Sequence, residues 1–540
     1  MPTVLGLHGG FTVGQHEPAA CLIIDGKVQA IYEEERFNRI KSSYGLLPKY
    51  SLLALAKDFN LKSQKDIDLV VVDGITYKDT SDRWSFFLKR ILGFCPTIFV
   101  CHHQEAHAAA AFYGSGFDEA TAITLDAYGD NASGSIYKCS RSKGLELEKF
   151  YDTNESLGII YTAMTYHLGY EDGDEYKIMG LAPYSREEIY PEIDFFERDN
   201  LNRVLRNDPK VLSPFDYPAN SDGISELIGI SQRTSEDDIE VKHKDLAAKI
   251  QSDFTKSLIK KFDEALQKTQ CKDFVYSGGV ALNCTTNGVI KKKLGLNKLY
   301  ISPVSSDRGL AYGCACIGSS KLHESPTNLG VPYFGKSYSE DEILTELKNN
   351  NIKFIKPSNL IKRVSKLLKS ENIIGWFQGR SEAGARALGN RSILASAGTK
   401  SMKDKLNAKI KYREEFRPFA PLAIKKDALL MWDLDPDTDY SCMTYTVRAK
   451  QLASDFAPAS VHSDFTSRLQ VLEEYQNPLL YELLSEYKLL SGYGVLLNTS
   501  FNLKGQPIVE SPRDAIMTFF GCGLDFLILG PYLISKEHID

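Results

Sequence analysis

The sequence predicts an α/β fold whose amino-terminal part is duplicated, and two stretches support this. Residues 3–7 read as a buried strand, and residues 19–36 read as two further strands joined at Asp25-Gly26, a favoured tight hairpin turn. The same order of strand, glycine-containing loop and strand recurs at residues 120–139. Two halves with one pattern indicate an internal duplication.

Two more apolar strands run directly into glycines, in residues 273–283 and 299–313. Glycines just after a strand let backbone amides approach a phosphate or a ribose closely, although an ordinary tight turn is the alternative for each one alone. Four such junctions among alternating strands and helices predict a nucleotide-handling fold with its site at the strand ends. The candidate nucleotide-binding residues are Gly278, Gly279 and Asn283.

A domain boundary is expected between about residues 322 and 357, where turn formers replace long apolar runs. The expected domains are residues 1–340 and residues 355–540. Residues 187–244 are rich in charge, proline, asparagine and serine, and we expect them to form a helical or irregular insertion. The sequence does not indicate what this insertion does.

The composition excludes several classes of protein. The chain has 540 residues, of which 43% are hydrophobic and 25% charged, so a globular protein of about two to four folding units is expected. A net charge of −6 gives no basic footprint, so nucleic acid is not expected as a partner. No run of about 18 apolar residues predicts a membrane span. Ten cysteines without a C-x-x-C pair favour a reducing cytoplasm over a zinc ribbon or a disulfide framework.

Residues 101–130 outline a metal site. If the alanine-rich run there is helical, His103 and His107 stand four residues apart and project from one face. Asp126, at the end of the following apolar strand, would add a hard oxygen. Mixed imidazole and carboxylate ligation suits iron, manganese or zinc. The alternative is that the two histidines are ordinary core or surface residues of a good helix former.

The second domain carries arginines beside glycines in residues 379–391 and two further arginines in residues 411–419. Guanidinium groups bind phosphate oxygens bidentately, so together they predict an anion site, and a solvated charged face is the alternative for any one of them. After the apolar strand at residues 495–497, alternate positions carry neutral hydrogen-bonding groups. The candidate residues are Arg380, Arg386, Arg391, Arg413, Arg417, Asn498, Ser500 and Asn502.

Eight ordered motifs resemble the O-carbamoyltransferases, a family with members that act on nodulation factors, cephems and aminoglycosides. The motifs are EEERFNRIK, HHQEAHAA, DEYKIMGLAPY, SGGVALN, SDRGLAYG, GRSEAGARALGNRSIL, REEFRPFAP and LLNTSFN. The resemblance spans nearly the whole chain. It implies an amino-terminal domain of the actin and Hsp70 ATPase type, similar to the tRNA threonylcarbamoyl-transfer subunit, followed by a smaller YrdC-like α/β domain.

The resemblance also implies a two-step reaction. The smaller domain would make carbamoyl adenylate from carbamoyl phosphate and ATP, with Mg²⁺ accompanying the ATP, and the larger domain would pass the carbamoyl group to an alcohol. The arginine cluster would neutralise the repulsion between the two polyanions. The acceptor is expected to be a small molecule or a saccharide with a free hydroxyl, and a homodimer is possible.

Individual residues take their roles from the same resemblance. His16 matches a histidine that the family carries after its first strand, and it is the candidate general base for the acceptor hydroxyl. Lys41, at the end of the basic motif, is expected to meet phosphate or the acceptor. A structural or exposed histidine and a helix-surface lysine are the alternatives. The family's metal, usually Fe²⁺, is carried over to His103, His107, Asp126 and Asp307.

Other readings fit the sequence less well. A sugar kinase on the same ATPase-type fold leaves the histidine motif and the arginine-rich domain unexplained. A metallopeptidase requires H-E-x-x-H, whereas Gln104 follows His103 here. A nonenzymatic nucleotide-binding protein does not account for a complete set of candidate ligands and arginines. Related threonylcarbamoyl transfer and hydrogenase maturation belong to chains with other domain combinations.

Overall fold

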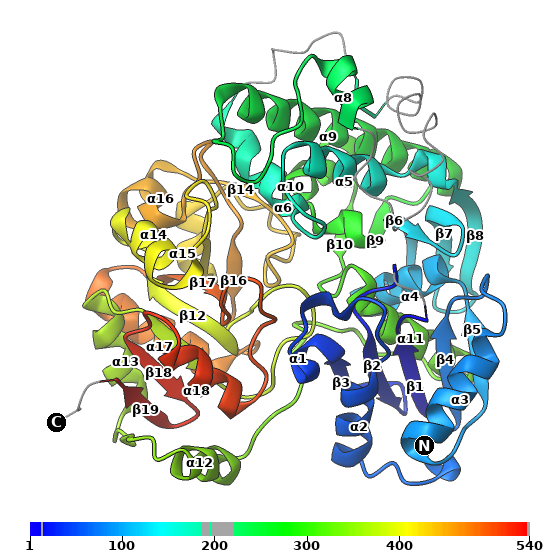
Figure 1. Cartoon of the computed structure of the whole chain (residues 1–540), viewed down its shortest axis with the longest axis horizontal. Helices are drawn as coiled ribbons and strands as arrows, with labels where there is room; N and C mark the ends of the chain where they lie inside the picture. The colour runs from blue at the N-terminus through cyan, green and yellow to red at the C-terminus, as the bar shows by residue number, and fades with distance from the viewer. Residues whose placement is uncertain (12–13, 186–193, 197–220, 537–540) are drawn as a thin grey trace. The chain divides into compact units, whose positions relative to one another are not determined.

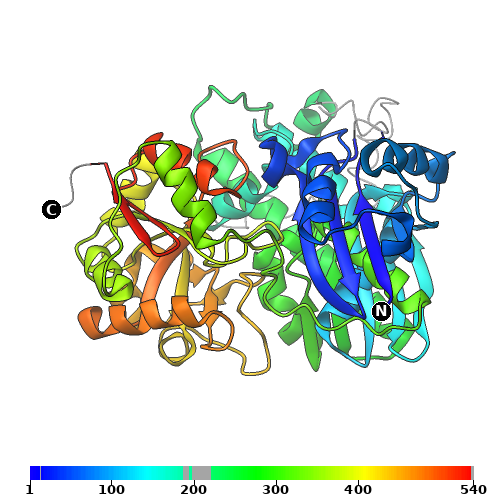
Figure 2. The ribbon, with the colours of Figure 1, turned by 90° about the horizontal axis from the view of Figure 1, so that it is seen from below.

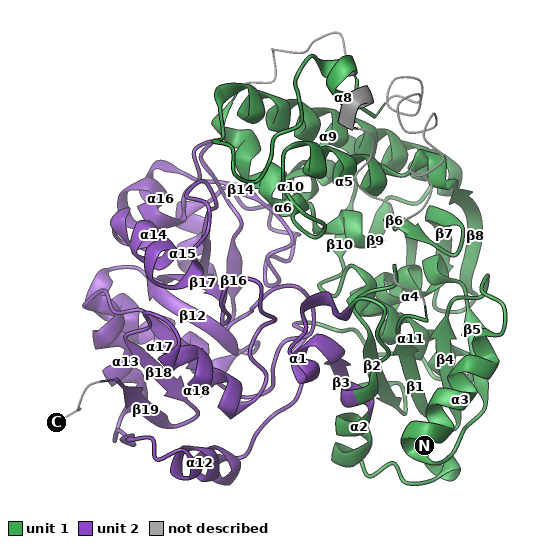
Figure 3. Cartoon of the chain, in the orientation of Figure 1, with its two compact units in different colours: residues 1–28, 44–49, 53–330 green, residues 29–43, 50–52, 331–540 purple. Residues whose placement is uncertain are grey.

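The computed structural model describes residues 1–11, 14–185, 194–196 and 221–536, which fall into two compact units. Unit 1 consists of residues 1–28, 44–49 and 53–330, and unit 2 of residues 29–43, 50–52 and 331–540 (Figure 3). The change from unit 1 to unit 2 at residue 331 falls within the expected linker. The inclusion of residues 29–43 and 50–52 in unit 2 was not expected from the sequence. The division into domains 1–340 and 355–540 stays a prediction.

Residues 1–330 form two five-stranded sheets with one topology (Figure 1). The strand orders are β3-β2-β1-β4-β5 and β8-β7-β6-β9-β10. Strand β1 pairs antiparallel with β2 and parallel with β4, and β4 pairs parallel with β5. In the same way β6 pairs antiparallel with β7 and parallel with β9, and β9 pairs parallel with β10. The strands are β1 (Thr3–His8), β2 (Ala19–Ile24), β3 (Lys27–Glu33), β4 (Leu69–Asp73), β5 (Ile98–Cys101), β6 (Glu119–Gly129), β7 (Ala132–Ser140), β8 (Gly144–Tyr151), β9 (Asp273–Ser277) and β10 (Lys298–Ile301). The α/β class and the expected duplication are confirmed.

Two small-residue helices, α4 (His103–Ser115) and α11 (Leu310–Lys321), pack against each other within unit 1. Helix α11 packs on β1 and β4, and α4 packs on β6 and β9. A Cβ atom on Gly313 would lie 1.9 Å from the carbonyl oxygen of Ala106, so only glycine permits this approach of the two helices. The alanines and glycines in both helices therefore bring the ends of the two sheets close together, which positions the site described below.

Residues 1–330 contain further helices, of which the one at residues 34–38 is counted with unit 2. None of the described helices combines the length and apolarity needed to cross a membrane. Of the expected insertion, residues 187–193 and 197–220 lie outside the described residues. The helices are α1 (Glu34–Asn38), α2 (Lys49–Asp58), α3 (Thr80–Leu92), α5 (Leu157–His167), α6 (Glu175–Leu181), α8 (Ser221–Ile228), α9 (Val241–Thr269) and α10 (Cys284–Leu294).

Unit 2 is built on a seven-stranded mixed sheet of order β16-β13-β17-β12-β11-β18-β19. Helices α13 (Leu360–Lys369) and α17 (Pro478–Ser491) pack on each other and on β12, β13 and β17 (Figures 1 and 2). Their apolar residues join Trp376 and Leu422 of the sheet in one buried core. The strands are β11 (Ile374–Phe377), β12 (Arg391–Ser396), β13 (Ala420–Ile424), β16 (Gln470–Leu472), β17 (Val495–Ser500), β18 (Phe526–Leu529) and β19 (Tyr532–Ser535), and the short pair β14 (Val447–Arg448) and β15 (Thr466–Ser467) lies outside this sheet. The other helices are α12 (Glu340–Asn349), α14 (Ser401–Leu406), α15 (Lys425–Met431), α16 (Gln451–Phe456) and α18 (Pro512–Phe520).

Arg36 explains why residues 29–43 belong to unit 2. Its side chain is 2% exposed and forms an ion pair with Glu33, with Nε 3.1 Å from Oε2. The same guanidinium donates to the carbonyl oxygens of Glu382, at 3.3 Å, and Gly384, at 3.2 Å. A buried arginine needs such partners because an uncompensated charge is costly away from water.

Candidate functional site

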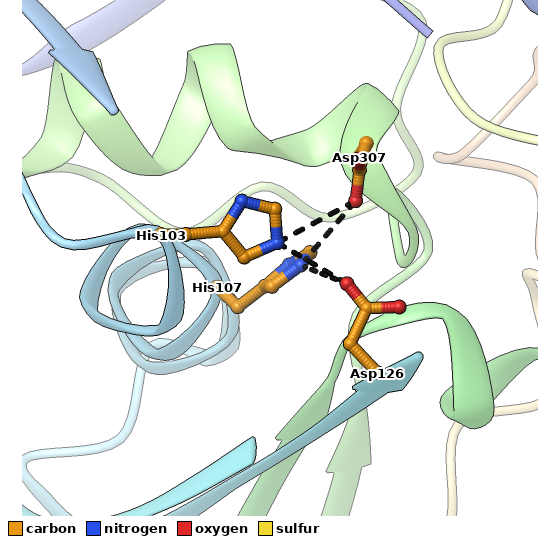
Figure 4. A group of neighbouring side chains, drawn as sticks. All are labelled: His103, His107, Asp126 and Asp307. Atoms are coloured by element: carbon orange, nitrogen blue, oxygen red, sulfur yellow. Dashed lines mark hydrogen bonds and ion pairs between the residues drawn. The ribbon is translucent and has the colours of Figure 1, made fainter. Parts of the chain in front are cut away.

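Four side chains meet at the carboxyl end of β6 in unit 1 (Figure 4). His103 and His107 come from α4, Asp126 from β6, and Asp307 from the short helix Asp307–Gly309 that leads into α11. All four residues are buried, and one donor atom of each lies within 4.8 Å of the others. The structure thus brings together all four residues expected to bind metal.

The spacing of the donor atoms suits a first-row divalent ion. The Nε2 atoms of His103 and His107 lie 3.1 and 3.2 Å from Asp126 Oδ2. They lie 3.7 and 3.6 Å from Asp307 Oδ1. Ligand atoms that share an ion at about 2.1 Å stand about 3.0 to 3.4 Å apart. The residues therefore fit an ion such as Fe²⁺ with little rearrangement.

The strand carrying Asp126 is irregular at this residue. The register between β6 and β7 shifts between Leu125 and Gly129, and such irregularities often redirect a side chain at a functional site. Asp126 Oδ1 accepts hydrogen bonds from the backbone N–H of Ala127, at 2.8 Å, and of Gly279, at 3.3 Å. These bonds leave Oδ2 facing the two histidines.

The amino terminus of α4 is fixed by Asp130, which sequence reasoning missed. Its Oδ2 accepts the backbone N–H of His103 at 2.8 Å, and its Oδ1 accepts the hydroxyl of Thr76 at 2.7 Å. An aspartate in this place satisfies a helix-terminal N–H that has no partner within the helix. The only sequence signal for Asp130 is its position in the loop after the strand that carries Asp126.

The electrostatics of the cluster favour positive charge. Burial by itself would lower the pKa of His103, but Asp307, Asp126 and Asp73 outweigh it and raise that pKa well above its usual value. Burial would likewise raise the pKa of Asp126, yet hydrogen bonds from His103 and His107 hold it well below its ordinary range. A site that holds its carboxylates ionised and draws protons onto a histidine is also one that attracts a metal cation.

His16 lies at the edge of this cluster. Its side chain is 34% exposed, and its Nδ1 stands 3.9 Å from Asp307 Oδ2, the oxygen next to the one that faces the histidines. Among the residues that the structure describes, this Nδ1 has no hydrogen-bond partner. This nitrogen lies beside the cluster, and the role of His16 as a general base stays a prediction.

Glu17 holds the main chain next to His16. Its carboxylate pairs with Arg308 and accepts the Ser306 hydroxyl at 2.6 Å. Burial would raise the pKa of Glu17, but Arg308 above all overcomes this and lowers it to about 2. Because Arg308 and Ser306 flank Asp307, this contact ties the His16 loop to the loop of a candidate metal ligand.

Lys41 begins the short helix Lys41–Ser43 and is exposed. It belongs to the segment counted with unit 2. Its expected contact with phosphate or the acceptor stays a prediction.

Of the candidate nucleotide-binding residues, Gly278 and Gly279 lie beside Leu125 and Asp126. Gly278 has φ of 97°, and a Cβ there would lie 2.1 Å from the Leu125 carbonyl oxygen. Asn283 caps α10 by accepting the N–H of Thr286 at 3.1 Å. Its amide also exchanges hydrogen bonds with Gln251 of α9, at 3.0 and 3.2 Å. Gln251 was missed because nothing in the sequence near it marks a site.

Two of the candidate arginines hold the backbone of unit 2. Arg380 donates to the carbonyl oxygens of Gln29, at 2.7 Å, and Gly335, at 2.9 Å. Arg391 is fully buried, lies 3.6 Å from the centre of the Phe377 ring and donates to the Gln378 carbonyl at 2.6 Å. Such hydrogen bonds are typical of arginines that stabilise loops, so the role of both residues toward phosphate stays a prediction. Arg386 is half-buried in the loop between them.

A second group joins Arg413 and Arg417 with Ser500 and Asn502 through Lys411, which was not predicted. Lys411 Nζ donates to the carbonyl oxygens of Ser500, at 2.6 Å, and Asn502, at 3.0 Å, and to Asn502 Oδ1 at 2.9 Å. Burial, reinforced by Arg413 and Arg417, lowers the pKa of Lys411 well below its usual value. Three cations crowded together in this way favour an anionic ligand.

Asn498 and Arg413 both make polar contacts within unit 2. Asn498 is buried and donates to Gln470 Oε1 at 2.7 Å and to the Ala387 carbonyl at 3.1 Å. Arg413 lies 4.2 Å from the Phe419 ring centre and donates to Asn407 Oδ1 at 3.0 Å. The residues Asn407–Lys411 form one turn of π-helix, a feature frequent at functional sites.

Sequence comparisons match two segments of the chain to families of known proteins. Residues 77–316 match the carbamoyltransferase N-terminus and residues 365–536 the carbamoyltransferase C-terminus. The nodulation protein NolNO of Sinorhizobium fredii is 32% identical over 99% of this chain and 82% of its own length. The nodulation protein NolO of Bradyrhizobium diazoefficiens is 33% identical over 81% and 79%. The 3'-hydroxymethylcephem-O-carbamoyltransferase of Amycolatopsis lactamdurans is 30% identical over 47% of each chain.

Solved structures resemble the chain more distantly. Component A of (R)-2-hydroxyglutaryl-CoA dehydratase from Acidaminococcus fermentans covers 60% of this chain and 100% of its own, at 17% identity and a TM-score of 0.36. Full-length HypF in its phosphate- and nucleotide-bound form covers 61% of this chain and 56% of its own, at 15% identity and a TM-score of 0.33. The family assignment rests on the sequence relatives, and by them the chain belongs to the carbamoyltransferase family.

Proposed function

We propose that this protein is an ATP-dependent O-carbamoyltransferase that makes carbamoyl adenylate and transfers its carbamoyl group to a hydroxyl of a small molecule or saccharide. The observation that carries the proposal is the buried cluster of two histidines and two aspartates with His16 at its edge. The related cephem enzyme, whose name states O-carbamoyl transfer, supports a hydroxyl acceptor.

The activation step is assigned to unit 2. Water hydrolyses the P–O bond of carbamoyl phosphate to give carbamate and phosphate, and a carbamate oxygen then attacks the α-phosphorus of ATP, which releases pyrophosphate. Both substrates are polyanions, so they react only where their charges are neutralised. Arg413 and Arg417 supply that charge, and an anion bound beside them would favour the charged form of Lys411. Lys411 also fixes the backbone of residues 500–502 beside them.

The transfer step is assigned to unit 1. The acceptor oxygen attacks the carbamoyl carbon, the bond from that carbon to the AMP phosphate oxygen breaks, and His16 takes the hydroxyl proton. His103, His107, Asp126 and Asp307 would hold Fe²⁺ or a similar ion, which when bound supplies Lewis-acid polarisation of an oxygen. The N–H of Gly279 keeps Asp126 Oδ1 turned away from the histidines.

The test is to measure products from ATP with purified protein, Fe²⁺ and Mg²⁺, with and without carbamoyl phosphate and without any acceptor. We expect AMP-yielding pyrophosphate release that requires carbamoyl phosphate. ADP formation in the presence of sugars would favour the kinase reading instead. No nucleotide turnover with any metal, even when candidate alcohols are supplied, would contradict the proposal.

A matched pair of variants assigns the step to unit 2. Arg417→Ala should abolish pyrophosphate release because it removes one of the three clustered cations, while the metal content stays unchanged. Arg448→Ala removes an exposed arginine of β14 and should leave release unchanged. Equal activity of both variants would remove Arg417 from the activation step.

A further inference from the structure

Asp73 lies behind the metal cluster, at the end of β4, and its two oxygens contact two different histidines. The residue is 4% exposed. Its Oδ2 accepts from His103 Nδ1 at 3.1 Å, and its Oδ1 accepts from His8 Nδ1 at 2.8 Å. Asp73 is outside the cluster of candidate ligands, because it binds the ring nitrogen of His103 that faces away from Asp126 and Asp307.

His8 continues this chain of contacts toward the candidate base. It is 1% exposed and ends β1. Its Nε2 lies 3.0 Å from the backbone carbonyl oxygen of His16. A carboxylate and a carbonyl both accept hydrogen bonds, so in this arrangement each ring nitrogen of His8 donates one. One buried side chain therefore links Asp73 to the main chain of His16.

The sheet itself places these two residues together. Strands β1 and β4 are parallel neighbours in which Leu7 is the partner of Val72, so His8 and Asp73 follow side by side where both strands end. Polar residues at adjacent carboxyl ends of parallel strands face the same site. Neither residue belongs to a motif that marked the site in the sequence.

We propose that Asp73 and His8 are positioning residues that hold the candidate metal ligand His103 and the main chain of the candidate base His16 in a fixed relation. Asp73 keeps a hydrogen on His103 Nδ1, so Nε2 is the nitrogen left to bind a metal ion. His8 binds both Asp73 and the backbone carbonyl of His16, so it fixes the main chain at His16 relative to Asp73. The part that concerns His16 rests on the proposed function, whereas the part that concerns His103 requires only a metal ion.

The first test replaces Asp73 by asparagine, which preserves shape but turns one acceptor oxygen into a donor. Binding of Co²⁺ is followed by its visible spectrum on the full chain without substrates. We expect about 10- to 100-fold weaker binding and a shifted spectrum, as is usual when a partner of a metal-binding histidine is lost. Carbamoyl-phosphate-dependent pyrophosphate release should be unchanged. Wild-type affinity and spectrum in a folded Asp73→Asn protein would overturn the role of Asp73.

The second test uses two substitutions of His8 that each keep one contact. The amide nitrogen of asparagine imitates Nδ1 and keeps the bond to Asp73, whereas that of glutamine imitates Nε2 and keeps the bond to the His16 carbonyl. We expect His8→Asn to lower kcat for carbamoyl transfer by about 10- to 100-fold without changing the acceptor KM. His8→Gln should retain transfer within several-fold of the wild type.

Thermal unfolding of both variants is measured first, to show that they are as stable as the wild type. Equal loss in the two variants, or equal retention, would overturn the role of His8, because a core histidine that only fills space does not distinguish the two amides. If the wild type shows no transfer to any alcohol, the proposed function fails, and the Co²⁺ measurement on Asp73→Asn still decides the positioning of His103.

Discussion

The imidazole of His103 packs directly over the Cα of Gly129. A Cβ atom on Gly129 would lie 2.2 Å from His103 Cδ2 and 2.5 Å from its Nε2. Gly129 is the last residue of β6, after the register shift that redirects Asp126. Because glycine has no side chain, residue 129 leaves the space that the His103 ring occupies in the cluster.

Gly129→Ala should therefore displace the His103 ring and weaken metal binding by on the order of 10- to 100-fold, as loss of ligand placement does elsewhere. Metal content after dialysis, with titration of Fe²⁺ or Co²⁺, measures this. Gly93→Ala is the control: Gly93 has φ of 83° with no atom within 4 Å of its added Cβ. That change should cost about 1 kcal/mol of stability and leave metal binding intact. Equal metal binding by the two variants would contradict the steric argument.

His107→Ala should lose metal and carbamoyl transfer but retain pyrophosphate release, because His107 belongs to the cluster in unit 1 and the cationic group lies in unit 2. His102→Ala is the matched control. His102 caps α4, accepting the Gln104 N–H at 3.1 Å, so its loss costs about 1 kcal/mol without removing a ligand. Full transfer by a metal-free His107→Ala protein would refute the ligand assignment.

Lys411→Met should raise the KM for carbamoyl phosphate or reduce pyrophosphate release by about 10- to 100-fold, which corresponds to a lost charged hydrogen-bonding group of about 1.5 to 3 kcal/mol. The metal content should be unchanged. Lys409→Met, two residues earlier, removes a half-exposed lysine 3.9 Å from Asp525 and should have little effect. Thermal unfolding of both proteins distinguishes lost activity from lost folding. An active Lys411→Met protein would argue against an anion-binding site at Lys411.

The duplicated fold and three residues of the cluster, His103, His107 and Asp126, could be predicted because their signals are local. A strand that ends in a glycine-containing loop can be recognised within about ten residues, and a spacing of four residues in a helix brings His103 and His107 to one face. Asp307 required the family resemblance, since nothing in its spacing relates it to the histidines. Its neighbour Arg308 pairs with Glu17, a contact between residues 291 positions apart.

The other contacts of the site could not be predicted, because they depend on which atoms lie near each side chain in the folded protein. Arg380 and Arg391 carry the same guanidinium as Arg413, yet they donate to backbone carbonyls of loops far apart in the sequence. Asp73 and His8 end two strands separated by more than sixty residues, and only parallel pairing makes them neighbours. Lys411 resembles any lysine of a charged segment until its burial against residues 500–502 is seen. Sequence patterns specify residue types at such positions but not their partners.

His167, outside the site, predicts how stability depends on pH. It ends α5, is 2% exposed, and its Nε2 lies 3.0 Å from the Ile230 carbonyl oxygen. Among the described residues its Nδ1 has no hydrogen-bond partner, so a second proton would be buried unpaired. Burial accordingly lowers the pKa of His167 to about 4, against about 6.5 in an unfolded chain.

Between pH 6.5 and 4 the unfolded chain therefore binds a proton at His167 that the folded chain does not, so the free energy of unfolding should fall as the pH is lowered through this window. The difference of about 2.5 pKa units corresponds to about 3 kcal/mol at most. His167→Gln keeps a donor for the Ile230 carbonyl but cannot titrate, so urea unfolding of this variant should depend less on pH in that range. His323→Gln, which replaces an exposed histidine, should follow the wild type. If His167→Gln and the wild type lose stability in parallel on acidification, the neutral buried imidazole is not what makes the protein acid-sensitive.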